Sequence, residues 1–130
     1  LRLAYTFTRA TITATGQTRD QSQGKQLIYT PEHQGRLALQ GQWRAFSLHY
    51  THTFTGYRYT TSDNSAFLPG YDLGSVYLQH CWQRPRWQLR SSLRCDNLWG
   101  REYEILAARP MPRQMLGLGL DVVFTGSPTR

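Results

Sequence analysis

The chain has 130 residues, a formal net charge of +7 and a mean hydropathy of −0.56. This length allows one domain with a modest core, and because the chain opens on Leu1-Arg2-Leu3 in the middle of a strand pattern, we expect a piece of a longer protein. No apolar run approaches the roughly 18 residues of a membrane helix, which excludes a helical membrane protein, and scattered arginines without a nucleic-acid motif argue against a nucleic-acid partner.

A two-residue period of apolar and polar residues runs through almost every segment, and no segment has the 3.6-residue stripe of an amphipathic helix. The sequence therefore predicts an all-β fold of about six antiparallel, up-and-down strands. The polar run 15–26 and the turn-rich run 57–70 are predicted loops. The expected strands are residues 1–8, 27–43, 46–55, 71–82, 87–96 and 115–124.

Successive side chains of a pleated strand point to opposite faces, so the alternation divides the strands into an apolar side and a polar side. The polar side is expected to be rich in Thr, Ser and Gln and to be net basic. Its expected charged members are Arg2, Arg36, Arg90, Arg94 and Asp121. The expected apolar side includes Leu37, Leu39, Trp43, Phe46, Leu48, Tyr50, Phe54, Val76, Leu78, Trp82, Trp87, Leu89, Leu93, Cys95, Leu116, Leu118, Leu120, Val122 and Phe124.

The connections between the predicted strands are alternately long and short. Long polar loops alternate with turns of two to four residues at 44–45 and 83–86, and outer-membrane barrels have this asymmetry, with short periplasmic turns and long extracellular loops. About ten residues separate two groups of aromatic residues, which matches the 9 to 11 residues of a tilted membrane strand. These groups resemble the two aromatic girdles of a membrane protein. Trp43, Phe46, Trp82 and Trp87 flank the short turns, and Tyr57, Tyr59, Phe67, Tyr71, Trp99 and Tyr103 lie at the other end.

The last 30 residues carry the most specific pattern. The run 97–104 reads Asn-Leu-Trp-Gly-Arg-Glu-Tyr-Glu, and Arg109-Pro110-Met111-Pro112 then leads into an alternating strand that ends at Phe124. This resembles the C-terminal end of TonB-dependent outer-membrane receptors, which usually reads Asn-Leu-Phe-Asp-Lys-Glu-Tyr, then Pro-Met-Pro-Gly-Arg, then a strand ending in Phe. Trp99 stands for the Phe, Gly100 stands for the Asp, and the Gly after the second Pro is missing.

The resemblance implies that residues 1–124 are the C-terminal strands of a large transmembrane β-barrel, of about 22 strands, in the bacterial outer membrane. It implies a receptor for active transport of a scarce, bulky nutrient such as an iron-siderophore or cobalamin, with no enzymatic activity and no cofactor. The implied partners are the remaining barrel strands, an upstream plug domain, the TonB energy-coupling protein and outer-membrane lipid. Six strands alone cannot close into a barrel. Residues 125–130 are expected to be a disordered tail, because Gly126 and Pro128 do not prolong a strand.

Two sets of residues are candidates for contacts in such a receptor. The polar-side residues Arg2, Arg36, Arg90, Arg94 and Asp121 would line the lumen and face the plug. Arg and Tyr suit anionic or aromatic chelates, and the candidates for substrate contact in the outer loops are Tyr57, Arg58, Tyr59, Asp63, Arg101 and Arg109.

No arrangement of residues points to catalysis or metal binding. His49 and His52 are three apart in a strand and so point to opposite faces, and Cys81 and Cys95 lack the Cys/His spacing of a zinc site. The two cysteines are expected on opposite faces, which forbids a disulfide. Two other interpretations remain open: a soluble β-sandwich binding module, such as a carbohydrate-binding domain, and a passive porin-like channel.

Overall fold

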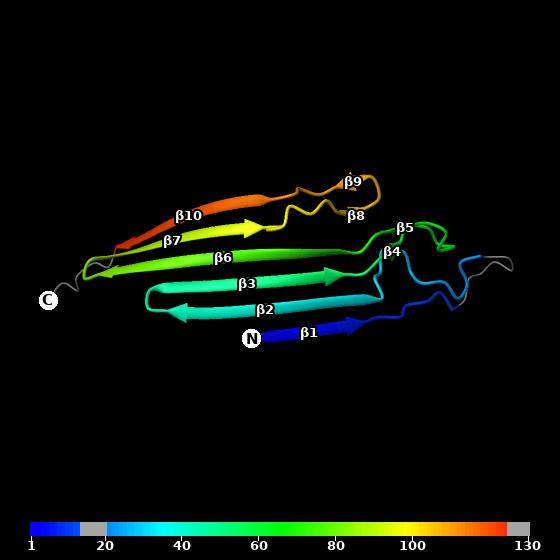
Figure 1. The fold of residues 1–130 in the computed structure, drawn as a ribbon, viewed down its shortest axis with the longest axis horizontal. Helices are drawn as coiled ribbons and strands as arrows, with labels where there is room; N and C mark the ends of the chain where they lie inside the picture. The colour runs from blue at the N-terminus through cyan, green and yellow to red at the C-terminus, as the bar shows by residue number, and fades with distance from the viewer. Residues whose placement is uncertain (14–20, 125–130) are drawn as a thin grey trace.

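The computed structural model describes residues 1–13 and 21–124, and there the chain is all-β, without a helix. Six strands form one antiparallel sheet in the order β1-β2-β3-β6-β7-β10, with two free edges (Figure 1). The predicted six-stranded antiparallel arrangement is confirmed, and the sheet is open. Nowhere in these ranges is there a helix of the length and apolarity needed to cross a membrane. The strands are β1 (Arg2–Phe7), β2 (His33–Trp43), β3 (Phe46–Thr55), β6 (Tyr71–Arg84), β7 (Trp87–Asp96) and β10 (Met115–Phe124).

Two small hairpins lie at the long-loop end of the sheet, and the sequence did not predict them. The first pairs β4 (Arg58–Tyr59) with β5 (Phe67–Leu68), and the second pairs β8 (Glu104–Leu106) with β9 (Arg109–Pro110). Each strand has only two or three residues, which is too short for a two-residue period to register.

The long strands match the predicted ranges closely, with two differences. β2 begins at His33 and not at Leu27, because Pro31 has no N–H for a ladder and Tyr29 adopts a left-handed φ of 55°. β6 continues to Arg84, beyond the expected end at Trp82. The predicted tail, 125–130, lies outside the described residues, as does the first half, 15–20, of the loop predicted at 15–26.

Strand ends step in one direction across the sheet. Trp43 and Phe46 close the β2–β3 turn, and Phe46 pairs with His80. β6 runs on to Arg84, four residues past His80, before it pairs with Trp87. At about 3.3 Å per residue, the β6–β7 turn therefore reaches about 13 Å further along the strands than the β2–β3 turn. A progressive stagger of this kind accompanies the strand tilt of a closed barrel.

A single layer leaves the chain almost without a core. The only buried apolar residues in the described ranges are Leu68 and Cys95, and no side chain there is less than 2% exposed. The accessible area is 10107 Å², whereas a compact 15.1 kDa monomer exposes roughly 7,100 Å². Both faces of the sheet are consequently open to whatever surrounds it.

Candidate functional site

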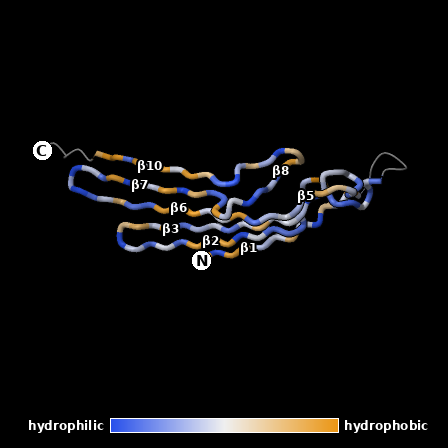
Figure 2. The backbone as a smooth tube through the Cα atoms, turned by 45° about the horizontal axis from the view of Figure 1, so that its top comes forward, coloured by the Kyte–Doolittle hydropathy of each residue, from blue (hydrophilic) through white to orange (hydrophobic). Residues whose placement is uncertain are grey.

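The pairing register divides the whole sheet into one apolar face and one polar face. Directly paired residues share a face, so each pair carries the assignment to the next strand. Leu48 pairs with Leu78, which pairs with Leu93, which pairs with Leu118. The two faces predicted from alternation are confirmed across all six strands, and the alternation of hydropathy is visible along the tubes of Figure 2.

All five residues predicted to face a lumen lie together on the polar face. Arg2 and Arg36 lie near the β1 edge of the sheet. Arg36 pairs with Ala4 on one side and with Thr53 on the other. At the opposite side, Asp121 pairs with Arg90, and Arg94 Nε lies 2.7 Å from an Asp96 carboxylate oxygen. Two of these arginines thus have a carboxylate neighbour, while Arg2 and Arg36 stand among neutral side chains.

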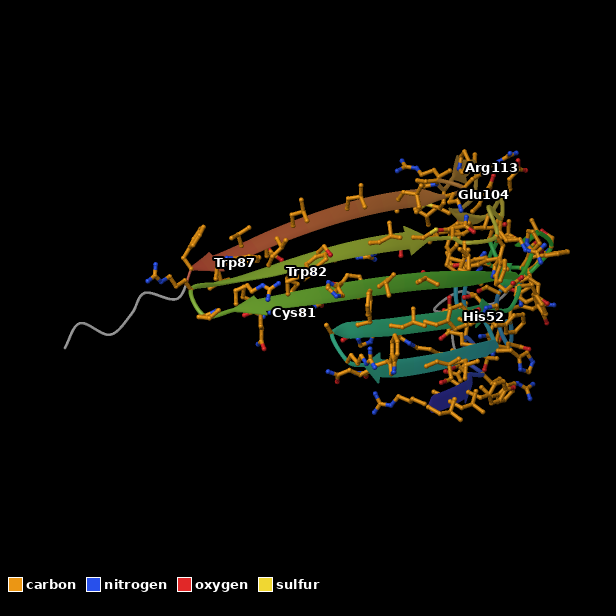
Figure 3. The ribbon with its side chains drawn as sticks, turned by 60° about the vertical axis from the view of Figure 1, so that its left-hand side comes forward. His52, Cys81, Trp82, Trp87, Glu104 and Arg113 are labelled. Atoms are coloured by element: carbon orange, nitrogen blue, oxygen red, sulfur yellow. The ribbon has the colours of Figure 1, made fainter. Side chains whose placement is uncertain are left out.

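The apolar face is unusually exposed at its β10 edge. Leu116, Leu118 and Leu120 are 73%, 86% and 74% exposed. Its two ends carry aromatic residues, as expected of girdles. At the short-turn end, the His80 ring lies 4.2 Å from Phe46 and 3.8 Å from Trp82, centroid to centroid. Figure 3 shows Trp82 and Trp87 at this end and His52 at the other.

Trp99 lies at the long-loop end of the apolar face through a contact with β6. Leu98 N–H donates to the carbonyl of Gly74 at 2.8 Å, so the chain stays beside β6 after β7 ends. The indole of Trp99 then lies over Gly74, where a Cβ would come within 2.7 Å of Nε1. Only glycine leaves room for this packing.

Asn97 fixes the bend that carries Trp99 there. Its backbone has a left-handed φ of 52°, a conformation that Asn tolerates. Its side-chain amide donates to the carbonyls of Arg101 and Pro112, at 2.8 and 3.3 Å, and its Oδ1 accepts from Arg101 N–H at 2.9 Å. Asn97 is 5% exposed, so the motif that resembles the receptor family acts here as a structural clamp.

Arg58 was predicted as a substrate contact and differs from that expectation. It is only 4% exposed, and its guanidinium lies 4.8 Å from the centre of the Tyr71 ring. One Nη donates to the carbonyls of Glu104 and Pro69, at 2.9 and 3.4 Å. Arg58 therefore ties β4 to the β8–β9 hairpin, and it is not presented to the solvent as a loop contact would be.

The other five predicted substrate residues also lie at the long-loop end of the sheet, but they do not form one site. Tyr57 and Tyr59 pack edge to face with centroids 5.5 Å apart, and their hydrogen bond raises the pKa of Tyr57, with the negative charge of Glu32 adding to the shift. Arg101 reaches Asp72 at 3.4 Å. Arg109 is exposed on β9, and Asp63 belongs to a separate loop.

Asp63 organises the loop between β4 and β5. Its carboxylate accepts from the Ser65 hydroxyl at 2.8 Å and from the Ser65 N–H at 3.2 Å. Hydrogen bonds from Thr61 and Ser65 lower the pKa of Asp63 to about 2. The carboxylate therefore stays ionised and holds the loop.

A cleft of about 570 Å³ opens between the two small hairpins. Tyr103 forms part of its wall and packs against Tyr71, with ring centroids 4.7 Å apart; burial raises the pKa of Tyr103. Arg113 forms an ion pair with Glu102 at its rim. The cleft joins aromatic, acidic and basic groups, which suits a polar ligand with an aromatic part. Its lining is Leu68, Pro69, Glu102, Tyr103, Glu104, Pro110, Met111 and Arg113.

Sequence reasoning missed two features of this end. The cleft depends on hairpins with no periodic signal. A second group joins His52, Asp72 and Arg101 beside Trp99: Asp72 lies 3.9 Å from His52 Nε2 and 3.4 Å from Arg101. Its one signal was a pair of polar residues, His52 and Asp72, at apolar-side positions of β3 and β6.

No metal site appears in the part of the chain that the structure describes, since no three His, Cys, Asp or Glu side chains there could hold an ion. Cys81 and Cys95 are free thiols. They lie on opposite faces, as predicted, because Cys81 pairs with Arg90 and Cys95 pairs with Val76.

Comparison with known proteins adds no relative to this description. No protein-family model matches the chain, and no curated protein sequence matches it either.

Proposed function

We propose that this chain forms the C-terminal wall and outer loops of a TonB-dependent receptor in the bacterial outer membrane. The receptor would take up a scarce, bulky nutrient such as an iron-siderophore or cobalamin. The open sheet would be one part of a barrel that further strands of the same protein complete, and it would have no transport activity alone.

One observation carries the proposal: a single-layer sheet presents a continuous apolar face that nothing in the described chain covers. Leu118, at 86% exposure, is the most exposed large apolar side chain within the six strands. Contiguous apolar surface of this extent is rare on a soluble monomer. Immersion in lipid removes the free-energy cost of exposing this face to water, because acyl chains surround its side chains while the backbone groups stay paired in the ladder.

The same observation weighs against the soluble β-sandwich. A sandwich packs the apolar face of one sheet on a second sheet about 10 Å away. The ten strands of the described ranges make one six-stranded sheet and two short hairpins at its end, so these ranges supply no second layer.

The polar face supports a wetted lumen that holds a plug. Its arginines and hydroxyl side chains can form water-bridged contacts, which are released without exposing an apolar core. A shallow hollow on this face gathers His49, Thr51, Ser75, Tyr77, Arg94 and Asp96.

The long-loop end supports nutrient binding. The loops are linked into one layer: Tyr29 N–H donates to the Tyr59 carbonyl at 2.8 Å, and Arg58 joins β4 to β8. A linked layer gives a ligand a fixed surface, and the cleft beside Tyr103 is one hollow in it.

The test uses the full-length protein in a bacterial strain that lacks its own receptors for iron chelates and cobalamin. We expect a heat-modifiable protein in the outer-membrane fraction and uptake that requires TonB. Uptake that persists without TonB would favour the porin-like channel, and a folded protein in the water-soluble fraction would favour the sandwich.

A further inference from the structure

The charges of the sheet are distributed unequally between its two ends. Three arginines, Arg44, Arg84 and Arg86, lie in or beside the two short turns, and residues 33–62 and 73–95 contain no Asp or Glu. The long-loop end, by contrast, carries both signs of charge, with Asp63, Glu102 and Glu104 among its basic residues. The charged side chains of the two short turns and of the described residues that flank them in β2, β3, β6 and β7 are therefore all basic.

Three tryptophans lie beside the same two turns, with Arg44 over Trp43 and Arg84 paired with Trp87. Trp43, Trp82 and Trp87 are 67%, 42% and 36% exposed, and Figure 3 shows Trp82 and Trp87 together beside the β6–β7 turn. We call these three tryptophans with Arg44, Arg84 and Arg86 the short-turn rim. Tryptophan prefers the headgroup level of a bilayer, so the rim marks that level under the proposed function.

Arg84 points to the lipid side. It lies two residues beyond Trp82 in β6 and pairs with Trp87, so it shares their apolar face. Two residues are roughly 6.6 Å of strand, or about 5 Å of depth at a tilt near 40°. The arginine therefore reaches beyond Trp82 and lies level with Trp87 in the register, where its guanidinium would meet phosphate and not acyl chain.

Arg44 is held at the other turn in a comparable position. Its guanidinium carbon lies 5.0 Å from the centre of the Trp43 ring, a cation–π contact that keeps the charge beside the girdle. If the strands tilt by about 40° from the membrane normal, two turns that are two strand spacings apart lie at equal depth when one is displaced along the strands by roughly 8 Å. The observed displacement of the β6–β7 turn is about 13 Å. The two turns then differ in depth by only about 4 Å.

Within residues 1–13 and 21–124, no carboxylate forms an ion pair with Arg44, Arg84 or Arg86. The nearest one in the register is Asp121, which pairs with Arg90 on the polar face, away from the lipid side. We infer that the short-turn rim binds the headgroups of anionic phospholipids, of the phosphatidylglycerol type, and so selects them over zwitterionic lipids around this sector of the wall. This inference rests on the proposed function.

The test measures lipid contact at the rim itself. A photo-crosslinking amino acid replaces Ala45, in the β2–β3 turn, in the full-length protein. The protein is placed in vesicles of equal parts phosphatidylglycerol and phosphatidylcholine, and the crosslinked lipids are counted by mass spectrometry. One arginine near an anionic surface corresponds to about a fivefold preference, so we expect at least a fivefold excess of phosphatidylglycerol.

A charge-matched pair of variants locates the effect. R44Q/R84Q/R86Q should bring the ratio close to one. R9Q/K25Q/R113Q removes the same charge from the long-loop end and should leave the preference intact. In the unaltered protein, 0.5 M salt should weaken the preference, which provides a test even if the triple variant does not fold.

The outcomes separate this inference from the proposed function. Lipid crosslinks without a headgroup preference, or a preference that survives both R44Q/R84Q/R86Q and salt, would overturn the lipid selection and leave the barrel standing. If folded protein gave no lipid crosslink at position 45, both would fall.

Discussion

Leu78→Arg and Gln79→Arg form a matched pair that tests which face meets lipid. The two residues are neighbours in the middle of β6. Leu78 lies between Leu48 and Leu93, and Gln79 lies between two serines, Ser47 and Ser92. Neither substitution places an arginine directly opposite another charge, and apart from the long hydrogen bond of 3.3 Å that Gln79 accepts from the Tyr77 hydroxyl, the two variants differ mainly in the face.

The expected cost follows from the depth of Leu78. It lies four residues from Trp82 in one direction and four from Gly74, beneath Trp99, in the other. Four residues are about 13 Å of strand, or roughly 10 Å of depth at 40°, which puts Leu78 near the middle of an apolar band about 25 Å tall. An arginine there costs about 2 to 4 kcal/mol, or roughly a 30- to 900-fold change in the folding equilibrium.

The assay is urea unfolding of the full-length protein in lipid vesicles, with heat modifiability as a second readout. Leu78→Arg should lower the free energy of unfolding by about 2 to 4 kcal/mol, and Gln79→Arg should change it by less than about 0.5 kcal/mol. Equal losses in the two variants, or a greater loss for Gln79→Arg, would refute the assignment of the apolar face to lipid.

Three further predictions concern the long-loop end. Gly74→Ala should displace the indole of Trp99, lower the free energy of unfolding by about 1 to 3 kcal/mol and shift the tryptophan emission. Trp99→Leu should partly restore the stability of this variant. Additive losses of stability in the double variant would contradict the contact between Gly74 and Trp99. Arg58→Ala should speed amide hydrogen exchange in both small hairpins by roughly tenfold or more, since hydrogen bonds from a charged donor contribute about 1.5 to 3 kcal/mol, whereas unchanged exchange would show that the clamp is dispensable. The depressed pKa of Asp63 means that its hydrogen bonds stabilise the loop above the ordinary value of 3.8 and that this contribution is lost as pH falls through about 2; an NMR titration should show that midpoint, and Ser65→Ala should raise it.

The long strands could be predicted because their sequence signal is local. Residues 46–55 alternate between apolar and polar residues except at His52, and β3 has those bounds. In the sequence the apolar pattern of β2 begins at Leu27, but the ladder begins only at His33, because Pro31 has no N–H and Tyr29 is left-handed. The alternation of apolar and polar residues indicates on which face of the sheet a side chain lies. It does not indicate whether each residue has a backbone N–H that can join the ladder.

The long-loop end could not be predicted because tertiary contacts build it. Arg58 is of a residue type that suits contact with an anionic ligand. Its neighbours in the fold, Glu104 and Tyr71, are far away in the sequence, and they bury it. Likewise, no residue near Gly74 in the sequence indicates that the indole of Trp99 packs on it. The run around Asn97 has a local structural role, because it keeps the chain beside β6 after β7 ends.

Strand direction limits how the sheet could close. The six strands alternate, so β1 runs toward the long-loop end and β10 runs away from it (Figure 1). A neighbour on the free side of β10 must then run toward the long loops, and a neighbour on the free side of β1 must run away from them. An unbroken up-and-down chain joining these two edges has an even number of strands and begins at the short-turn end. A plug carried ahead of it would enter the barrel from that same side, where an energy-coupling protein could reach it.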